Sequence, residues 1–247
     1  MIIPDTFQKY NSSVDIAGDN FYNGGNFSGG IILKDETKTK LAALNFDNLP
    51  ANIDGFTLRK IYAADEDKFI FFTYADDATH CAVKIYFHEE THEFKVSQRI
   101  GLTEFCLTNF FTEDFAHFKA LISSELVDVI KNLRGVKSLN RFLREKKIDA
   151  WSYGLELPAT LEGFELFISP AAPVEVTNGS FIVINYADFA TNSDFVLYYN
   201  IYTDEFSGET RINGATHVIY TFDAKTLDEL TDKLKNHLAA ELKAIRQ

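Results

Sequence analysis

The chain has 247 residues, of which 46% are hydrophobic and 24% are charged, and this globular composition excludes disordered, collagen-like and low-complexity proteins. Its 36 acidic residues outnumber 24 basic ones, for a formal net charge of −12. Proteins that bind nucleic acid or anionic membranes need clustered Lys and Arg, so both functions are disfavoured. The 23 Phe and 11 Tyr residues favour β-rich structure, because flat side chains pack well on pleated surfaces.

Residues 1–48 have no copy elsewhere in the chain, and we expect a loop and a hairpin there that cap one sheet edge. They combine glycine-rich residues 24–30 with a polar run at residues 34–40. The chain start shows neither the basic nor the apolar segment of a secretory signal, and no run reaches the roughly 18 apolar residues of a membrane span. Two cysteines, Cys81 and Cys106, are too few for a disulfide framework, which indicates a reducing cytoplasm.

An internal repeat is the most informative feature of the sequence. Residues 49–56 recur at 157–164, an offset of 108, and from there the offset becomes 112. Between residues 68–100 and 180–212, 13 of 33 positions are identical, where chance gives roughly two. Two copies of this length are too long for a solenoid unit, so we expect each to be a small domain.

Each copy is predicted to form a small antiparallel sheet. Aromatic and β-branched runs at residues 56–62, 69–74 and 83–87 indicate three strands, and residues 195–199, continuing to 203, are the copy of the third. We expect a turn at residues 204–209, with Gly208 supplying a positive φ. Shorter strands are expected near 98–100 and 105–108 and, in the second copy, near 210–212 and 218–221.

Each copy then ends in an amphipathic helix. In the second copy, Thr226 and Glu229 have the spacing of a capping box. Apolar residues follow at helical spacing in both copies, at Leu227, Leu230, Leu234, Leu238, Leu242 and Ile245, and at Phe115, Phe118, Ile122, Leu126, Ile130 and Leu133. These stripes are expected to cover one face of each sheet.

The predicted fold is therefore α+β: a tandem duplication of a sheet of about four or five strands followed by one helix, the copies packed in a pseudo-two-fold arrangement. We divide the chain into a leader (1–48), a first repeat (49–134), a basic connector (135–156) and a second repeat (157–247). The connector should hold a short helix near 138–147. Its basic side chains, diluted by Glu145 and Asp149, are best explained as a solvated helix face: Arg141, Arg144, Lys146 and Lys147.

Residues 88–92 read His-Glu-Glu-Thr-His and match the zincin signature. In that chemistry His88 and His92 would share one face of a helix and bind zinc, with Glu89 polarising a bound water. Here the segment lies at the end of a strand and enters a turn. Within a strand, residues four apart share a face but lie about 13 Å from one another, too far to bind one zinc ion. Copy two has neither histidine nor glutamate at the matching positions. We therefore predict no cofactor and no metal, and a zinc-dependent hydrolase remains only an alternative.

The segment Tyr-Ala-Asp-x-Ala-Thr occurs at residues 74–79 and again at 186–191. Its aspartates are suited to hold a turn by accepting hydrogen bonds from the backbone two residues on. A duplicated recognition loop is the second interpretation, because loops on rigid sheets commonly carry binding. The candidate binding residues are Tyr74, Asp76, Thr79, Tyr186, Asp188 and Thr191.

No hydrolase, thiol or phosphate-loop motif is present in the sequence. We therefore expect a non-catalytic binding protein that docks a basic protein partner, in an adaptor or toxin-neutralising role by analogy. Alternatives are a small-molecule binder with an aromatic-lined cleft between the copies, and an enzyme whose residues converge only in the fold. The acidity is concentrated in residues 157–247, with a net charge of −7. Oligomeric state is left open.

Overall fold

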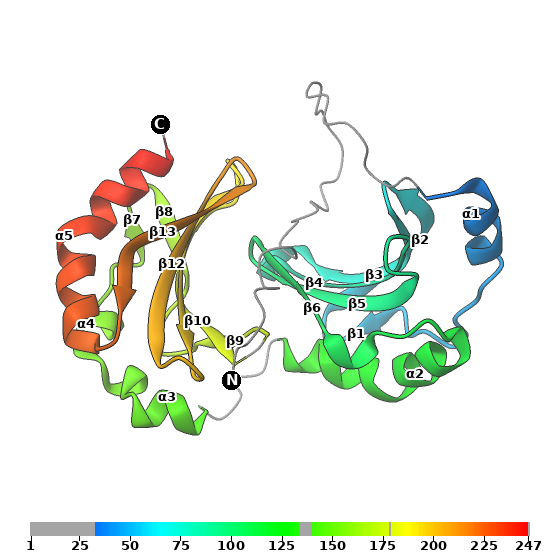
Figure 1. The fold of residues 1–247 in the computed structure, drawn as a ribbon, viewed down its shortest axis with the longest axis horizontal. Coiled ribbons are helices and arrows are strands. Elements are labelled where there is room, and N and C mark those ends of the chain that lie inside the picture. Colours follow the sequence, from blue (N-terminus) through cyan, green and yellow to red (C-terminus); the bar gives the residue numbers. More distant parts are fainter. Residues whose placement is uncertain (1–32, 134–139, 178, 247) are drawn as a thin grey trace, which may run out of the picture.

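The computed structural model describes residues 33–133, 140–177 and 179–246 and has an α+β fold with two antiparallel sheets and a C-terminal helix (Figure 1). The sheets have six and seven strands, more than the expected four or five, because two-residue strands too short to leave a sequence pattern extend them. The expected features at residues 24–30 and 138–139 lie outside the described residues. Among the described helices, none is both long and apolar enough to span a membrane.

The first sheet is a meander whose strands follow chain order, β1-β2-β3-β4-β5-β6, with each neighbouring pair antiparallel. The expected strands at 56–62, 69–74 and 83–87 are confirmed as parts of β2, β3 and β4. The elements of this half are α1 (Asp35–Ala42), β1 (Asn52–Ile53), β2 (Phe56–Asp65), β3 (Lys68–Asp76), β4 (Cys81–His88), β5 (Glu93–Ile100), β6 (Thr103–Cys106) and α2 (Phe115–Asn132), with 3-10 turns at Asp77–Thr79 and Thr108–Phe110.

The second sheet has the order β13-β12-β11-β10-β8-β7, and β9 pairs with the other end of β10. β10, β11 and β12 begin 112 residues after β3, β4 and β5 and have the same lengths. The elements of this half are β7 (Thr160–Leu161), β8 (Phe164–Ile168), β9 (Val174–Glu175), β10 (Ser180–Asp188), β11 (Ser193–Asn200), β12 (Glu205–Ile212), β13 (Ala215–Ala224) and α5 (Leu227–Ile245).

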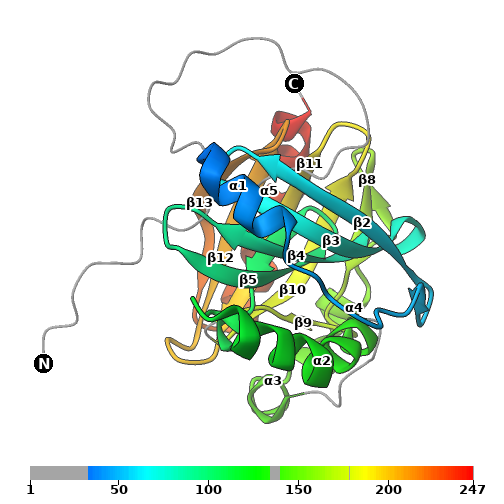
Figure 2. The same cartoon turned by 90° about the vertical axis from the view of Figure 1, so that its right-hand side faces the viewer.

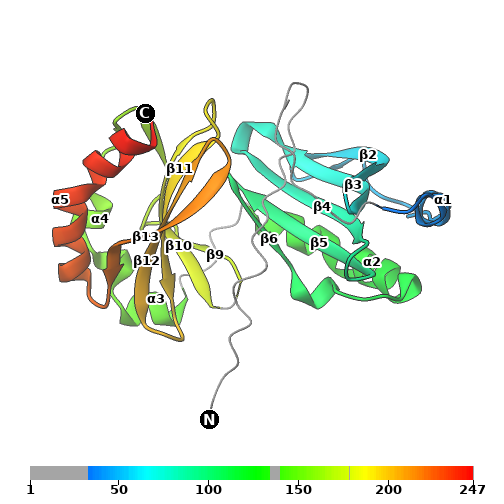
Figure 3. The same ribbon diagram turned by 45° about the horizontal axis from the view of Figure 1, so that its top comes forward.

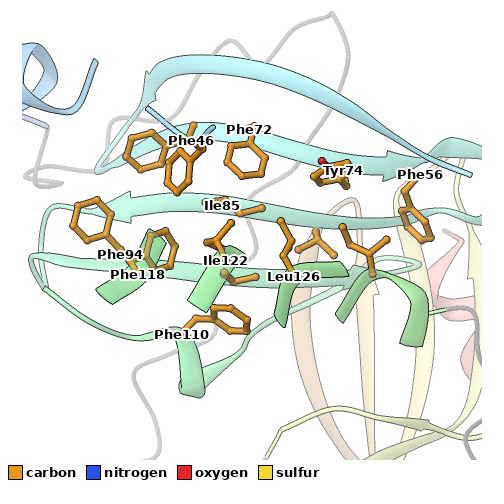
Figure 4. Packing of buried hydrophobic residues seen from close by; sticks show 14 of the residues in the cluster. Phe46, Phe56, Phe72, Tyr74, Ile85, Phe94, Phe110, Phe118, Ile122 and Leu126 are labelled. Carbon is orange, nitrogen blue, oxygen red and sulfur yellow. The ribbon is translucent and has the colours of Figure 1, made fainter. Parts of the chain in front are cut away.

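Both long helices bury the apolar stripe that the sequence predicts. α2 lies against one face of the first sheet, and α5 covers the face of the second sheet that is turned away from the first half (Figures 1 and 3). Figure 4 shows Phe118, Ile122 and Leu126 of α2 packed against aromatic side chains of the sheet. The capping box differs in one contact, since Thr226 accepts from the Glu229 N–H while the Glu229 carboxylate accepts from the N–H of Lys225.

The connector packs on the second half. It forms α3 (Arg141–Glu145), a 3-10 turn (Ile148–Ala150) and α4 (Ser152–Leu155). Leu143, Ile148 and Trp151 are buried in the same apolar cluster as α5. Of the basic side chains, Arg141 is exposed and pairs with Glu145, whereas Lys146 is half-buried and donates to the Asp204 carboxylate.

The leader contains a helix where a loop and hairpin were expected. α1 occupies the polar run and lies beside β2 (Figure 2). Its acidic first turn and its pairs Asp35–Lys38 and Glu36–Lys40 supply the charge pattern that stabilises short helices. Leu41 anchors the helix in the first apolar cluster. This helix has one buried residue in eight, so its sequence shows no apolar stripe that would predict it.

The expected turn at 204–209 is wrong. β11 ends at Asn200, the turn spans residues 201–204, and β12 begins at Glu205. The positive φ belongs to Asp204, at 55°, while Gly208 lies inside β12. A Cβ on Gly208 would stand 3.1 Å from Cγ1 of Ile219 on β13, so this glycine permits a close approach between neighbouring strands.

Candidate functional site

The two recurring turns are held by their aspartates, as the sequence predicts. Asp76 ends β3, and its Oδ1 accepts a hydrogen bond from the backbone N–H of Ala78 at 3.2 Å. In the second copy, Asp188 Oδ1 accepts from the N–H of Ala190 at 3.1 Å. This is the local bond by which aspartate initiates a turn. The threonine hydroxyls donate to the same aspartates, Thr79 to the Asp76 carboxylate and Thr191 to the Asp188 carbonyl.

The tyrosines of the two turns lie in the cores. Tyr74 donates its hydroxyl to the Pro50 carbonyl at 2.7 Å, and Tyr186 donates to the Pro158 carbonyl at the same distance. Both residues are fully buried, and burial raises the pKa of each hydroxyl to about 12. Each of the six candidate binding residues therefore takes part in a hydrogen bond within the fold, and their role in binding stays a prediction.

The two recurring turns meet where the halves touch. The ring of His80, which follows the first turn, stacks on the ring of Phe189 in the second turn, with centroids 3.6 Å apart and planes at 4°. Phe167 of β8 meets Phe189 edge-on at 5.3 Å. A Cβ added to Gly101 would stand 2.8 Å from Phe167, so the β5–β6 turn also approaches β8 closely. The residue that follows one copy of the motif thus stacks on a residue inside the other copy.

Residues 88–92 span a strand end and a turn, as expected. His88 is the last residue of β4, and the turn that follows leads to Glu93 at the start of β5. The His88 Nε2 lies 2.9 Å from Oδ2 of Asp67, whereas His92 is exposed and has a φ of 54°. The helical pairing of histidines that zincin chemistry requires is absent from this described segment.

A buried ion pair lies on the face of the first sheet opposite α2. Lys84, whose side chain is 3% exposed, donates to both oxygens of Glu104 at 3.0 and 3.2 Å. Ser97 donates its hydroxyl to the same carboxylate at 2.6 Å. The Glu104 carboxylate therefore accepts three hydrogen bonds from two donor groups, one of which is the positively charged Lys84 ammonium. This arrangement suits a structural link between β4, β5 and β6 better than proton transfer.

A second buried pair lies on the second sheet. Asp194 Oδ1 stands 3.5 Å from Arg211 Nε, beyond hydrogen-bond geometry, and Asn185 donates to Asp194 Oδ2 at 3.2 Å. Asp194 is 1% exposed, and this burial raises the pKa of its carboxyl to about 6 despite the opposing effect of Arg211. Oδ1 and Nε are both left without a hydrogen bond. The pair is therefore buried but incompletely hydrogen-bonded.

The most exposed apolar side chains of the described residues gather on the second half. Tyr202, in the β11–β12 turn, is 78% exposed, and Val218 and Tyr220 on β13 are 59% and 76% exposed. β13 ends the strand order of its sheet, so within the part of the chain that the structure describes no strand lies beside one edge of this ten-residue strand. We call Val218, Tyr220 and this edge of β13, beside which the described residues place no strand, the β13 surface. An exposed edge with aromatic side chains is typical of a docking site.

An open cavity of 380 Å³ lies elsewhere, between the connector and the start of α5. It is not the cleft between halves that the small-molecule alternative predicts. Its lining carries both charge signs, in Glu145, Lys146, Lys147, Lys225, Thr226, Leu227 and Asp228. Lys146 is already engaged by Asp204 and by the carbonyl of Lys225. The cavity therefore favours no single ligand.

Comparisons of this chain with protein-family models, with curated proteins and with solved structures found no match. The acidity of the second repeat is visible in the sequence, but the exposed Val218 and Tyr220 were not predicted from it. Their alternation with Ile219, which packs against the second core, was the available signal for a half-buried edge strand.

Proposed function

We propose that this protein is a non-catalytic binding module that docks a basic protein partner on the β13 surface. The observation that carries the proposal is the free edge of β13, with Val218 and Tyr220 more than half exposed. Backbone groups along such an edge can pair with an added strand, and exposed aromatic residues supply the anchors that dominate binding energy. The net charge of −12 steers a basic partner toward the protein.

Site-specific photo-crosslinking tests the proposal. A photoreactive amino acid replaces Tyr220 in one variant and Val127 in the other, since Val127 is 36% exposed on α2, outside the β13 surface. We expect position 220, and not position 127, to capture one predominant basic protein from native extract. The yield should fall at high salt, because screening weakens the steering charges.

Two results would contradict this function. One is equal capture at both positions, which would indicate nonspecific contact. The other is a yield of the adduct at position 220 that does not change when Val218→Thr is added. That substitution removes apolar surface while keeping β-branching. A thermal unfolding curve for each variant checks that the fold is retained.

We also infer that the two halves are related by duplication and packed about a pseudo-two-fold axis. Three observations support this: the constant offset of 112 residues between equivalent strands, the paired tyrosine–proline hydrogen bonds, and the contact between the two recurring turns. Equivalent segments meet in this way near a two-fold axis. The free thiols of Cys81 and Cys106 support the proposed cytoplasmic location.

A further inference from the structure

Three potential metal ligands converge at one end of the first sheet. Asp67 lies between β2 and β3, His88 ends β4, and Glu90 lies in the turn to β5. One ligand atom from each of the three lies within 4.8 Å of the others. The pairing of Lys68 with His88 across β3 and β4 produces this convergence, because it places the two loops side by side.

The contacts around His88 orient its ring toward the other two residues. Its Nδ1 lies 3.2 Å from the Thr91 hydroxyl, and its Nε2 lies 2.9 Å from Asp67 Oδ2. The backbone N–H of Glu89 donates to the Asp67 carbonyl at 2.8 Å and ties the loops together. A partner on the second ring nitrogen is the usual support of a metal-binding histidine.

The distances fit a shared ion. Donor atoms about 2.1 Å from a tetrahedral zinc ion lie about 3.4 Å apart, so Nε2 and Oδ2, which are 2.9 Å apart, need to separate by only about 0.5 Å to hold one ion. The side chains of His88 and Asp67 are 14% and 23% exposed, and Glu90 is exposed, so water has access to complete the coordination. Of the nearby cations, Lys95 is paired with Glu93 at 3.1 Å, and Lys68 stands 4.0 Å from Asp67. The two carboxylates of Asp67 and Glu90 outweigh the single positive charge of Lys68, so the site has a net negative charge.

The second half has no such site at the equivalent positions. Those positions, 112 residues later, are Gly179, Asn200 and Tyr202. Asn200 Oδ1 accepts the N–H groups of Tyr202 and Thr203, so it holds its own turn. A Cβ on Gly179 would stand 2.5 Å from the Tyr202 ring, which fills the space. The first half thus has three ligand-type side chains where the second has a packed turn.

We propose that Asp67, His88 and Glu90 bind one divalent first-row transition-metal ion, such as Zn²⁺. One imidazole nitrogen and two carboxylate oxygens suit such an ion, whereas Mg²⁺ and Ca²⁺ prefer oxygen alone. The ion cross-links the β2–β3 and β4–β5 loops and stabilises the first sheet. The site is separate from the β13 surface and goes beyond the proposed function. It also differs from the zincin set, because His92 and Glu89 are outside it.

Calorimetric titration with Zn²⁺ of the full, tag-free chain, first stripped of metal by a chelator, tests the site. We expect one ion per chain and a raised melting temperature with Zn²⁺. His88→Ala and Glu90→Gln should each weaken binding at least about tenfold, as losses of supporting groups already do. His92→Ala is the matched control, since it removes a histidine from the same turn without touching the group, and it should leave binding unchanged.

Other outcomes overturn the proposal. No binding by the native chain excludes the site, and binding that survives both His88→Ala and Glu90→Gln places the ion elsewhere. A loss in His92→Ala equal to that in His88→Ala assigns the ion to the two histidines instead. Glu90 is exposed, so Glu90→Gln keeps the test valid if His88→Ala fails to fold. Absorption of bound Co²⁺, changed by Glu90→Gln and not by His92→Ala, gives an independent readout.

Discussion

Among the described charged residues, Asp194 has the least exposed side chain. A carboxylate that is 1% exposed and imperfectly paired loses hydration that Arg211 at 3.5 Å does not replace. Its folded pKa of about 6 exceeds the ordinary 3.8, so between these values the folded state binds more protons than the unfolded state. The contribution of Asp194 to stability is therefore largest at low pH and is lost as pH rises through about 6.

Asp194→Asn tests this directly. We expect the difference in unfolding free energy, native minus variant, to fall by about 3 kcal/mol between pH 4 and pH 7.5, because a shift of about two pKa units is worth that much. Urea denaturation at several pH values measures it. A difference that instead grows with pH would mean that Arg211 keeps the carboxylate charged in the folded protein. Asp232→Asn, on the exposed face of α5, is the control and should show little change with pH.

At the scale of elements, a buried polar link joins β4, β5 and β6. Lys84 and Glu104 come from β4 and β6, strands that are not direct neighbours in the sheet. Because Lys84 has almost no exposure, its charge depends on Glu104 in place of water. The pair therefore couples the sheet centre to its edge.

Removing one member of this pair should cost much more than removing a surface pair. We expect Lys84→Met to lower the unfolding free energy by about 3 kcal/mol, since it leaves Glu104 without its cation. The double variant Lys84→Met/Glu104→Gln should recover part of that loss. Lys40→Met, which breaks an exposed pair with Glu36, should cost less than about 1 kcal/mol. Equal effects of the two lysine variants in urea denaturation would contradict a buried link.

At the scale of the whole molecule, apolar packing joins the two halves. The first core cluster extends into the second sheet through Ile168, Ile182 and Val196. The stacked rings of His80 and Phe189 lie at the same boundary. Contacts of this kind couple the unfolding of neighbouring units. We therefore expect the halves to unfold together.

Trp151 reports on this coupling, because it is the single tryptophan and is buried in the second cluster. The unfolding transition monitored by Trp151 fluorescence should coincide with the transition monitored by far-UV circular dichroism, which reports on both halves. Phe189→Ala should lower the free energy of unfolding obtained from both measurements by about 1 kcal/mol, because the aromatic stack is lost. Phe142→Ala, at a side chain 46% exposed, should change little. Separate transitions in the native chain would show that the halves unfold independently.

The amino-acid sequence by itself determined the local elements of this protein. The aromatic strands, the two leucine- and phenylalanine-rich helix faces and the aspartate turns follow from periodicity and short-range hydrogen bonding, which depend on neighbouring residues only. Residues 88–92 could be assigned to a strand end and a turn for the same reason. Two features could not be assigned in this way: α1, which has one buried residue, and the place of Gly208 inside a strand. Both depend on contacts with segments that are distant in the sequence.

Only the tertiary structure decided which residues far apart in the chain meet. It brings Asp67 to His88 across a strand pair, stacks His80 on Phe189 across the boundary between halves, and leaves Val218 and Tyr220 uncovered. These outcomes depend on strand register and on the packing of sheet against sheet. A shift of one residue in register would reverse which face of β13 is exposed. The net charge of −12 belongs to the sequence, but the surface on which a partner docks belongs to the fold.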